Sequence, residues 1–128
     1  MPRIEEQIEI EAGATEVFRF CHDVDRRAEW DQRVARAQML SRPPMRRGTL
    51  LRFDTRPAKG AVFTWDAEIV EYHFPSGSKL QVVDVAPSGT FSGASETWRL
   101  ASSGGTTRFT LVWAYVPRGI VGRLLDAV

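Results

Sequence analysis

The sequence predicts an α+β domain in which a curved antiparallel sheet of about seven strands packs against a few helices. One strand-like segment is followed by two short helical segments and then by about six strand-like segments in a row. The regular alternation of strands and helices that a parallel sheet requires is absent from this order, so hairpin connections are expected. Long antiparallel strands twist and curl, and the concave face then buries apolar side chains against a helix.

The first strand and the two short helices are predicted from the first thirty residues. Residues 3–11 alternate between isoleucine and mostly acidic side chains, as in a half-buried strand, and Glu6 interrupts the isoleucine face. An amphipathic helix is indicated by the spacing of three apolar residues, which are Val17, Cys21 and Val24. Asp25 is a plausible N-cap for a second helix that runs to Trp30.

The rest of the chain reads as strands separated by turns that contain Pro or Gly. The predicted strands are 33–40, 49–56, 61–73, 79–86, 89–100 and 106–116. After them, Pro117 is expected to open a last helix, because Ile120, Leu124 and Val128 recur at helical spacing. No linker or repeat interrupts this order, so residues 1–128 are interpreted as one domain.

Composition excludes several classes of function. Lys and Arg number 17 against 16 Asp and Glu, which argues against a dedicated nucleic-acid binder with a strongly basic face. The single cysteine, Cys21, cannot form an internal disulfide, so we expect a reducing, cytoplasmic location. Together with only two histidines it cannot supply a structural zinc site, and we expect no metal and no cofactor. No apolar run is long enough for a transmembrane segment, and the acidic amino terminus does not resemble a secretion signal.

Four segments in order resemble a known family. They are IEIEAGATEVFRFCHDVDRRAEWD, TRPAKGAVFTWDAEIVEY, SETWRL and GGTTRFTLVWAYVPRGIVGRLLD, and together they span nearly the whole chain. The chain resembles the START/Bet v 1-like (SRPBCC) superfamily, in particular its polyketide cyclase/dehydrase and lipid-transport group. This resemblance implies a helix-grip fold, in which a seven-stranded antiparallel sheet wraps around a long C-terminal helix and encloses a hydrophobic cavity. Members of the group bind lipids, sterols, polyketides or other apolar molecules there, and some are cyclases or dehydratases.

The last helix is shorter than the resemblance implies. Only twelve positions remain from Pro117 to Val128, so a helix there would span about 18 Å. Either the sequence ends before the helix does, or the cavity is partly open. An open apolar wall predicts that a second copy of the chain covers it as a homodimer.

The strand alternation places a set of large apolar side chains on the concave face. We expect them to line a Trp-rich ligand cavity, although they could equally fill a core: Trp30, Phe63, Trp65, Ile69, Trp98, Phe109, Trp113 and Tyr115.

Three polar side chains are candidates for proton transfer. Glu96 shares the face of Trp98 and would be partly desolvated there, unless an inward arginine pairs with it. His73 shares the register of Trp65, but a bulge would turn it to the surface, which is the commoner place for such a histidine. Tyr115 could offer its hydroxyl to a carbonyl, or could be a core residue.

Other residues have weaker claims to a functional role. Arg36 and Gln38 could point inward, although an exposed position is favoured for Arg36. Cys21 is expected to be a chemically inert residue of the core. A basic group near one hairpin end could attract an anion, but a solvated face is the commoner explanation: Arg42, Arg46, Arg47, Arg52, Arg56 and Lys59. Aromatase/cyclases of the resembled group place an inward arginine where this chain has Ile69, which leaves enolate stabilisation without an obvious agent.

Three functions follow as hypotheses. The leading one is binding of a small hydrophobic or aromatic, polyketide- or lipid-like molecule. The second is a polyketide cyclase or dehydratase that uses Glu96, His73 or Tyr115. The third is a non-catalytic module that docks a partner protein on its concave face.

Overall fold

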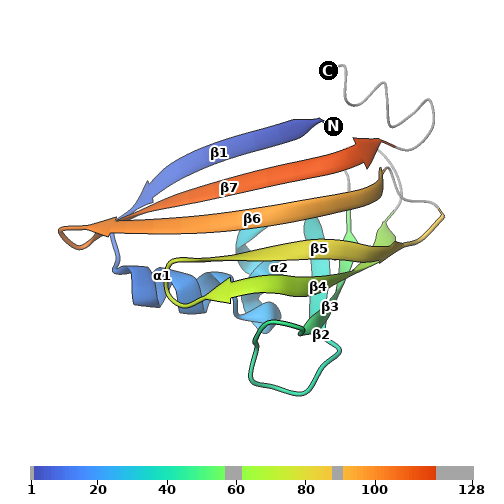
Figure 1. Cartoon of the computed structure of the whole chain (residues 1–128), viewed down its shortest axis with the longest axis horizontal. Helices are drawn as coiled ribbons and strands as arrows, with labels where there is room; N and C mark the ends of the chain where they lie inside the picture. Colours follow the sequence, from blue (N-terminus) through green and yellow to red (C-terminus); the bar gives the residue numbers. More distant parts are fainter. Residues whose placement is uncertain (1, 57–61, 88–90, 118–128) are drawn as a thin grey trace.

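The computed structural model describes residues 2–56, 62–87 and 91–117. The chain begins with strand β1 (Arg3–Ile10), helix α1 (Ala14–Cys21), a 3₁₀ turn η1 (Val24–Arg26) and the one-turn helix α2 (Arg27–Trp30). Six strands follow (Figure 1): β2 (Val34–Met39), β3 (Leu50–Thr55), β4 (Phe63–His73), β5 (Gly77–Val85), β6 (Phe91–Ser103) and β7 (Thr106–Pro117).

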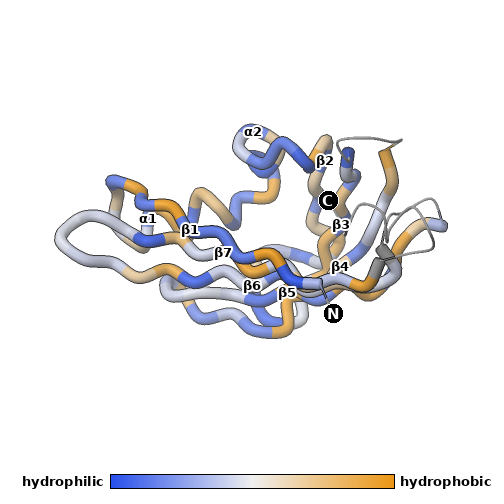
Figure 2. The backbone as a smooth tube through the Cα atoms, turned by 90° about the horizontal axis from the view of Figure 1, so that it is seen from above, coloured by the Kyte–Doolittle hydropathy of each residue, from blue (hydrophilic) through white to orange (hydrophobic). Residues whose placement is uncertain are grey.

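All seven strands form one antiparallel sheet. Their spatial order is β1-β7-β6-β5-β4-β3-β2, so successive strands from β2 to β7 are hairpin neighbours and β1 pairs with β7. The sheet curves, and α1 and α2 lie on its concave side (Figure 2). The predicted α+β helix-grip arrangement, with a curved seven-stranded sheet and two short helices after the first strand, is confirmed.

The period-two patterns put the predicted side chains on the concave face. In β4, Phe63, Trp65, Ala67 and Ile69 are buried while the residues between them are partly exposed. A register shift between Ile69 and Glu71 then changes the parity of the strand. His73 therefore lies on the surface, with 68% of its side chain exposed.

The boundaries differ from the sequence-based prediction in a few places. Asp25 caps no helix, because it lies inside η1, whose N-cap residue is Asp23. Gly77 belongs to β5, although it was expected to lie in a turn. Pro117 is paired with Phe91 at the end of β7 and does not open a helix, and the rest of the predicted last helix lies outside the described residues.

The core divides into two hydrophobic clusters on the concave face. The Trp65 cluster contains Trp65 and Trp113 with inward residues of β3, β4 and β5. The Trp98 cluster joins the inner face of α1, namely Val17, Phe18 and Cys21, to Trp98, Leu100 and Phe109 of β6 and β7. Helix α1 is thus held by its apolar face, as its spacing predicted. Within the described parts of the chain, no helix is long and apolar enough to cross a membrane.

Replacement of Gly77 by alanine should destabilise the sheet. A Cβ atom there would lie 2.5 Å from the backbone oxygen of Trp98, and backbone atoms in a paired strand have little room to move. Overpacking of this kind costs about 2 kcal/mol of unfolding free energy, measurable by urea denaturation. Gly93→Ala in β6 is the matched control, since a Cβ at Gly93 meets nothing within 4 Å. Equal stability of the two variants would contradict this packing.

Candidate functional site

The centre of the concave face is occupied by a buried arginine. Helix α2 directs Arg27 onto the sheet, where only 5% of its side chain is exposed. Its Nη2 lies 3.0 Å from Asp31 Oδ2 and 3.1 Å from Glu96 Oε1, and its Nε donates to Asp31 at 3.1 Å. The spacing i, i+4 along α2 places Arg27 and Asp31 side by side. Two carboxylates thus compensate one guanidinium that could not be buried alone.

Glu96 faces inward from β6, as its register with Trp98 predicted. Besides Arg27, the indole Nε1 of Trp98 donates to Glu96 Oε1 at 2.5 Å. The inward arginine that was considered as its partner is therefore present, and it comes from α2. Both hydrogen bonds are accepted by Oε1 of this carboxylate.

A second arginine completes the cluster at its solvent side. Arg33 donates to both oxygens of Asp31 at 3.1 Å, and its Nη2 lies 3.9 Å from Glu96 Oε2. Burial alone would raise the pKa of Asp31, but hydrogen bonds from Arg33 and the charges of Arg27 and Arg33 outweigh it and hold that pKa below its ordinary value. We call Arg27, Asp31, Arg33 and Glu96 the ion cluster.

Aromatic rings enclose the guanidinium of Arg27. Its Cζ lies 4.8 Å from the ring centroids of both Trp30 and Trp98 and 5.2 Å from that of Phe53. The cavity that remains beside Arg27 and Ile69 measures about 20 Å³, which is room for one water molecule. The middle of the concave face is therefore filled by protein.

A histidine fixes the end of α1 to the sheet. His22 Nδ1 lies 2.8 Å from the Phe18 carbonyl oxygen, and its Nε2 lies 2.7 Å from Ser78 Oγ in β5. Nδ1–H therefore donates to the carbonyl, and Nε2 accepts from the Ser78 hydroxyl. Burial is the main cause that lowers the pKa of His22 to about 4. The imidazole is neutral at physiological pH.

The predicted wall residues pack largely against one another. Trp65 stacks on Phe53 with a centroid distance of 4.4 Å and lies 5.9 Å from Trp113. Trp98 contacts Phe109 at 5.5 Å and Trp30 at 5.7 Å. The structure brings the eight wall residues onto one face, with Phe63 and Ile69 buried and Tyr115 partly buried, but in two clusters. A single Trp-lined cavity around them stays a prediction.

The larger open spaces lie on either side of Trp30, along β1. The α1 groove, of about 430 Å³, is lined by Ile8, Ile10, Ala12, Glu16, Val17, Phe20, Cys21, Trp30 and Phe109. The α2 groove, of about 390 Å³, is lined by Ile4, Glu6, Trp30, Asp31, Gln32, Arg33, Leu111 and Trp113. Trp30, Phe109 and Trp113 of the predicted wall thus line open space, and Glu6 faces the groove as its register predicted.

The other predicted site residues lie elsewhere. His73 is exposed at the end of β4, whereas Glu96 is buried on the concave side, so the structure does not bring the two side chains together. Arg36 is exposed, as favoured, and Gln38 is partly buried. Cys21 is buried in the Trp98 cluster, and burial raises its pKa to about 11, which makes the thiol unreactive.

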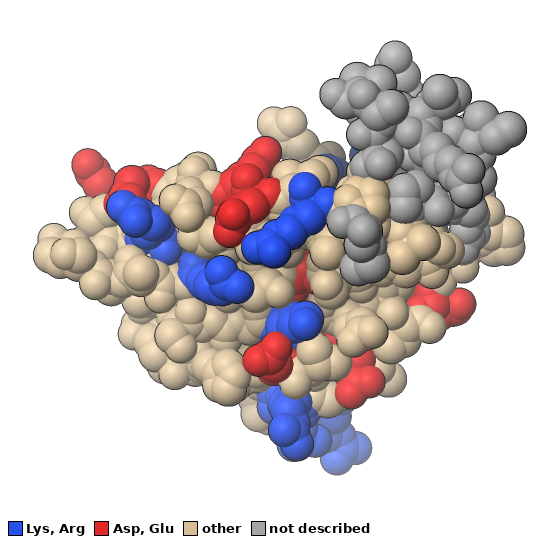
Figure 3. Space-filling view, turned by 45° about the horizontal axis from the view of Figure 1, so that its top comes forward, with Lys and Arg blue, Asp and Glu red and all other residues tan. Residues whose placement is uncertain are grey.

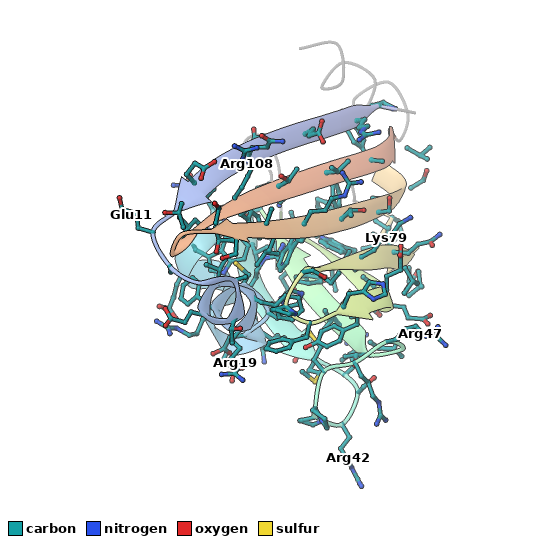
Figure 4. The ribbon with its side chains drawn as sticks, turned by 60° about the vertical axis from the view of Figure 1, so that its left-hand side comes forward. Glu11, Arg19, Arg42, Arg47, Lys79 and Arg108 are labelled. Atoms are coloured by element: carbon teal, nitrogen blue, oxygen red, sulfur yellow. The ribbon has the colours of Figure 1, made fainter. Side chains whose placement is uncertain are left out.

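The described members of the basic group line none of the three cavities named above. Arg42, Arg46 and Arg47 are exposed on the β2–β3 loop, and Figure 4 shows Arg42 and Arg47 pointing away from the sheet. Arg52 pairs with Asp66 at 2.8 Å, Arg56 is exposed, and Lys59 lies outside the described residues. On the face drawn in Figure 3, acidic and basic side chains are intermixed.

Sequence reasoning missed Arg27, Asp31, Arg33 and His22. The only local signal was the charged triplet spaced 27, 31 and 33 beside Trp30, which resembles a solvated helix surface. The partner that makes it a buried site, Glu96, lies 69 positions from Arg27.

Removal of one carboxylate from the ion cluster should strongly lower the free energy of unfolding. Glu96→Gln leaves Arg27 and the Trp98 N–H facing an uncharged amide in a buried place, so unfolding free energy should fall by about 3 kcal/mol in urea denaturation. Asp66→Asn, which breaks the more exposed pair with Arg52, is the control and should change stability far less. Similar losses in both variants would show that the ion cluster is not a special constraint.

Stability should fall as the pH drops below about 6.5. The unfolded chain protonates His22 near its ordinary pKa of 6.5, whereas the folded protein resists protonation until about pH 4. His22 therefore contributes fully above pH 6.5, and up to about 3 kcal/mol is lost as the pH falls to 4. His22→Gln should flatten the stability profile in this window, measured by denaturation at successive pH values. His73→Gln should keep the wild-type profile, and a flat wild-type profile would refute the burial of a neutral His22.

Comparisons with known proteins agree with this fold. Residues 1–128 match the family described as polyketide cyclase / dehydrase and lipid transport. Among solved structures, the chain is similar to the Zhui aromatase/cyclase from Streptomyces sp. R1128, with a TM-score of 0.78 and 19% identity over 98% of this chain and 82% of that one. It is also similar to a START superfamily protein from Mycobacterium smegmatis, with a TM-score of 0.75 and 14% identity over 99% and 86% of the two chains. Major latex-like protein 151 from Panax ginseng gives a TM-score of 0.71 and 12% identity over 98% and 89%.

At such identities the structural likeness establishes the fold, while the family follows from the match over the full sequence. A search of curated proteins finds no match. The chain belongs to the polyketide cyclase/dehydrase and lipid transport family.

Proposed function

We propose that the protein binds a small apolar or aromatic molecule, polyketide- or lipid-like in character, in the grooves on either side of Trp30. The observation that carries this proposal is the lining of the α1 groove, in which every described residue except Glu16 is apolar. Its volume of about 430 Å³ falls in the range of small-molecule sites, roughly 300–1,000 Å³.

Exposed apolar side chains support the same proposal. Ile8 on β1 is 58% exposed and Phe20 on α1 is 37% exposed, and both line the α1 groove. Ile4, which lines the α2 groove, is 47% exposed. Contiguous apolar surface of this kind gains free energy when a ligand removes it from water, at about 25 cal/mol per Å².

Trp30 joins the two grooves and supplies a polar atom. Its ring lines both spaces, and its buried Nε1 has no hydrogen-bond partner among the described residues. A buried donor without an acceptor costs about 1–3 kcal/mol. A carbonyl or hydroxyl oxygen on a ligand that reached this N–H would recover that cost, which favours a molecule with an oxygen on an apolar frame.

The family adds independent support. Its description covers both polyketide cyclisation and lipid transport, and one similar structure is an aromatase/cyclase. Both descriptions concern molecules that are largely apolar, which is the chemistry that the grooves of this chain suit.

The contacts favour binding over proton transfer. Oε1 of Glu96 accepts hydrogen bonds from Arg27 and Trp98, and protonation of this carboxylate would remove one charge of a buried ion pair. His73 lies on the outer surface, away from both grooves. Tyr115, which packs against the Trp65 cluster, is a candidate for contact with a ligand.

Binding of a neutral aromatic probe should depend on the groove surface. N-phenyl-1-naphthylamine should brighten on addition of the protein and receive energy from tryptophan, because it enters apolar space near Trp30. Ile8→Ser removes an apolar group from the wall and should weaken probe binding about tenfold, by the transfer free energy of a partly buried side chain.

Val83→Ser is the matched control for that variant. Val83 is 56% exposed, close to the value for Ile8, but it lines neither groove, so its replacement should leave probe affinity unchanged. Equal loss in both variants, or no fluorescence change with wild-type protein, would overturn the proposed function.

Sedimentation of the same samples tests the predicted homodimer, since a probe that occupies a dimer interface would dissociate the dimer.

A further inference from the structure

We propose that the grooves select ligands by the charge of their polar end, in the order organic cation, then uncharged molecule, then carboxylate. This inference rests on the proposed function, because it concerns which apolar molecule the grooves take. It follows from a comparison of the cations and carboxylates that face the grooves.

The cations at the α2 groove are already neutralised. Arg33 forms two 3.1 Å hydrogen bonds with Asp31, and Arg27 is held by Asp31 and Glu96. Two guanidinium groups and two carboxylates sum to zero charge in the ion cluster. A ligand carboxylate placed beside it would meet no net positive charge, and the Nε and Nη2 donors of Arg33 are already directed at Asp31.

Glu6 adds a negative charge that the ion cluster does not balance. It lies on the inner face of β1 between Ile4 and Ile8, opposite Leu111 of β7, and it lines the α2 groove. Its charge acts on Arg33, but in the described part of the chain no cation lies within 4 Å of its carboxylate. A carboxylate in the middle of an isoleucine wall forms a local attraction for a ligand cation.

The α1 groove is also lined by a negative charge. Glu16, in the first turn of α1, is the only charged residue in the described part of its lining. Arg26, which stacks over the lining residue Phe20 at 4.7 Å, is paired with Glu29 at 3.2 Å. Both grooves thus combine apolar walls with a carboxylate, an arrangement that favours an amine and disfavours a fatty acid.

A series with one tail and three polar ends tests this order. Decyltrimethylammonium, decanol and decanoate, each below its micelle concentration, are titrated into the full chain at low salt, and tryptophan fluorescence reports binding through Trp30 and Trp113. The cation should bind about fivefold more tightly than decanol and decanoate about fivefold more weakly, because a single partly solvated charge contributes about 1 kcal/mol. Near 1 M salt these differences should shrink while decanol affinity holds.

The variant Glu6→Gln should remove most of the discrimination. Affinity for decyltrimethylammonium should fall about fivefold, affinity for decanoate should rise, and decanol should be unaffected. Glu5→Gln is the matched control, because it removes the same charge from the opposite face of β1, where Glu5 lies 3.9 Å from Arg3. It should leave the order of the three ligands and their ratios close to the wild-type values.

The possible outcomes distinguish a failure of the charge rule from a failure of the proposed function. If decanol binds and decanoate binds as tightly as the cation, the charge rule is wrong and the apolar site stands. Equal effects of Glu6→Gln and Glu5→Gln would also overturn the rule, since overall charge and not the groove would then decide. If none of the three binds, the proposed function fails and the charge rule fails with it.

Discussion

The neutralisation of Arg27 on the concave face is the constraint on which the arrangement of this protein depends. A guanidinium at 5% exposure is tolerated only because Asp31 and Glu96 surround it with acceptors. These contacts tie α2, a helix of four residues, to β6. They act together with the contact between the Trp30 ring and Trp98, whereas α1 is fixed separately by the Trp98 cluster and by His22.

The same contacts decide where open space remains. Arg27 and the rings of Trp30, Trp98 and Phe53 fill the part of the concavity nearest β4 to β6. Strand β1 lies at the edge of the sheet beyond β7, where neither helix covers its isoleucines completely, so the grooves form there. Position in the sheet therefore places the apolar surface at one edge and the buried charges at the centre.

The sheet could be predicted from the sequence because each strand carries its own period-two pattern. The same alternation predicted the inward position of Glu96 correctly, since β6 and β7 stay in register from Gly93 onward. For His73 strict alternation gives the wrong face of the sheet, because the register irregularity in β4 cannot be recognised in the residue pattern. Arg27 could not be found, because a single helical turn shows no periodicity and its partner on β6 is known only once the chain has folded. The grooves likewise depend on how far α1 and α2 lie from β1, a distance that no local pattern encodes.

The position of Arg27 also illustrates why a similar fold need not carry the same chemistry. Ile69 occupies the strand position at which the sequence comparison expected an inward arginine, and Arg27 reaches the same small cavity from α2. A guanidinium can stabilise a developing oxyanion only if its donors are free to turn toward it. Here Nε and Nη2 of Arg27 are directed at Asp31 and Glu96, and a substrate oxygen would have to displace a carboxylate from a buried pair to recruit these donors. That displacement costs several kcal/mol, the order of what one oxyanion donor contributes to a rate. The contacts of Arg27 are those of a structural element, and they favour the proposed recognition of an apolar molecule over cyclisation.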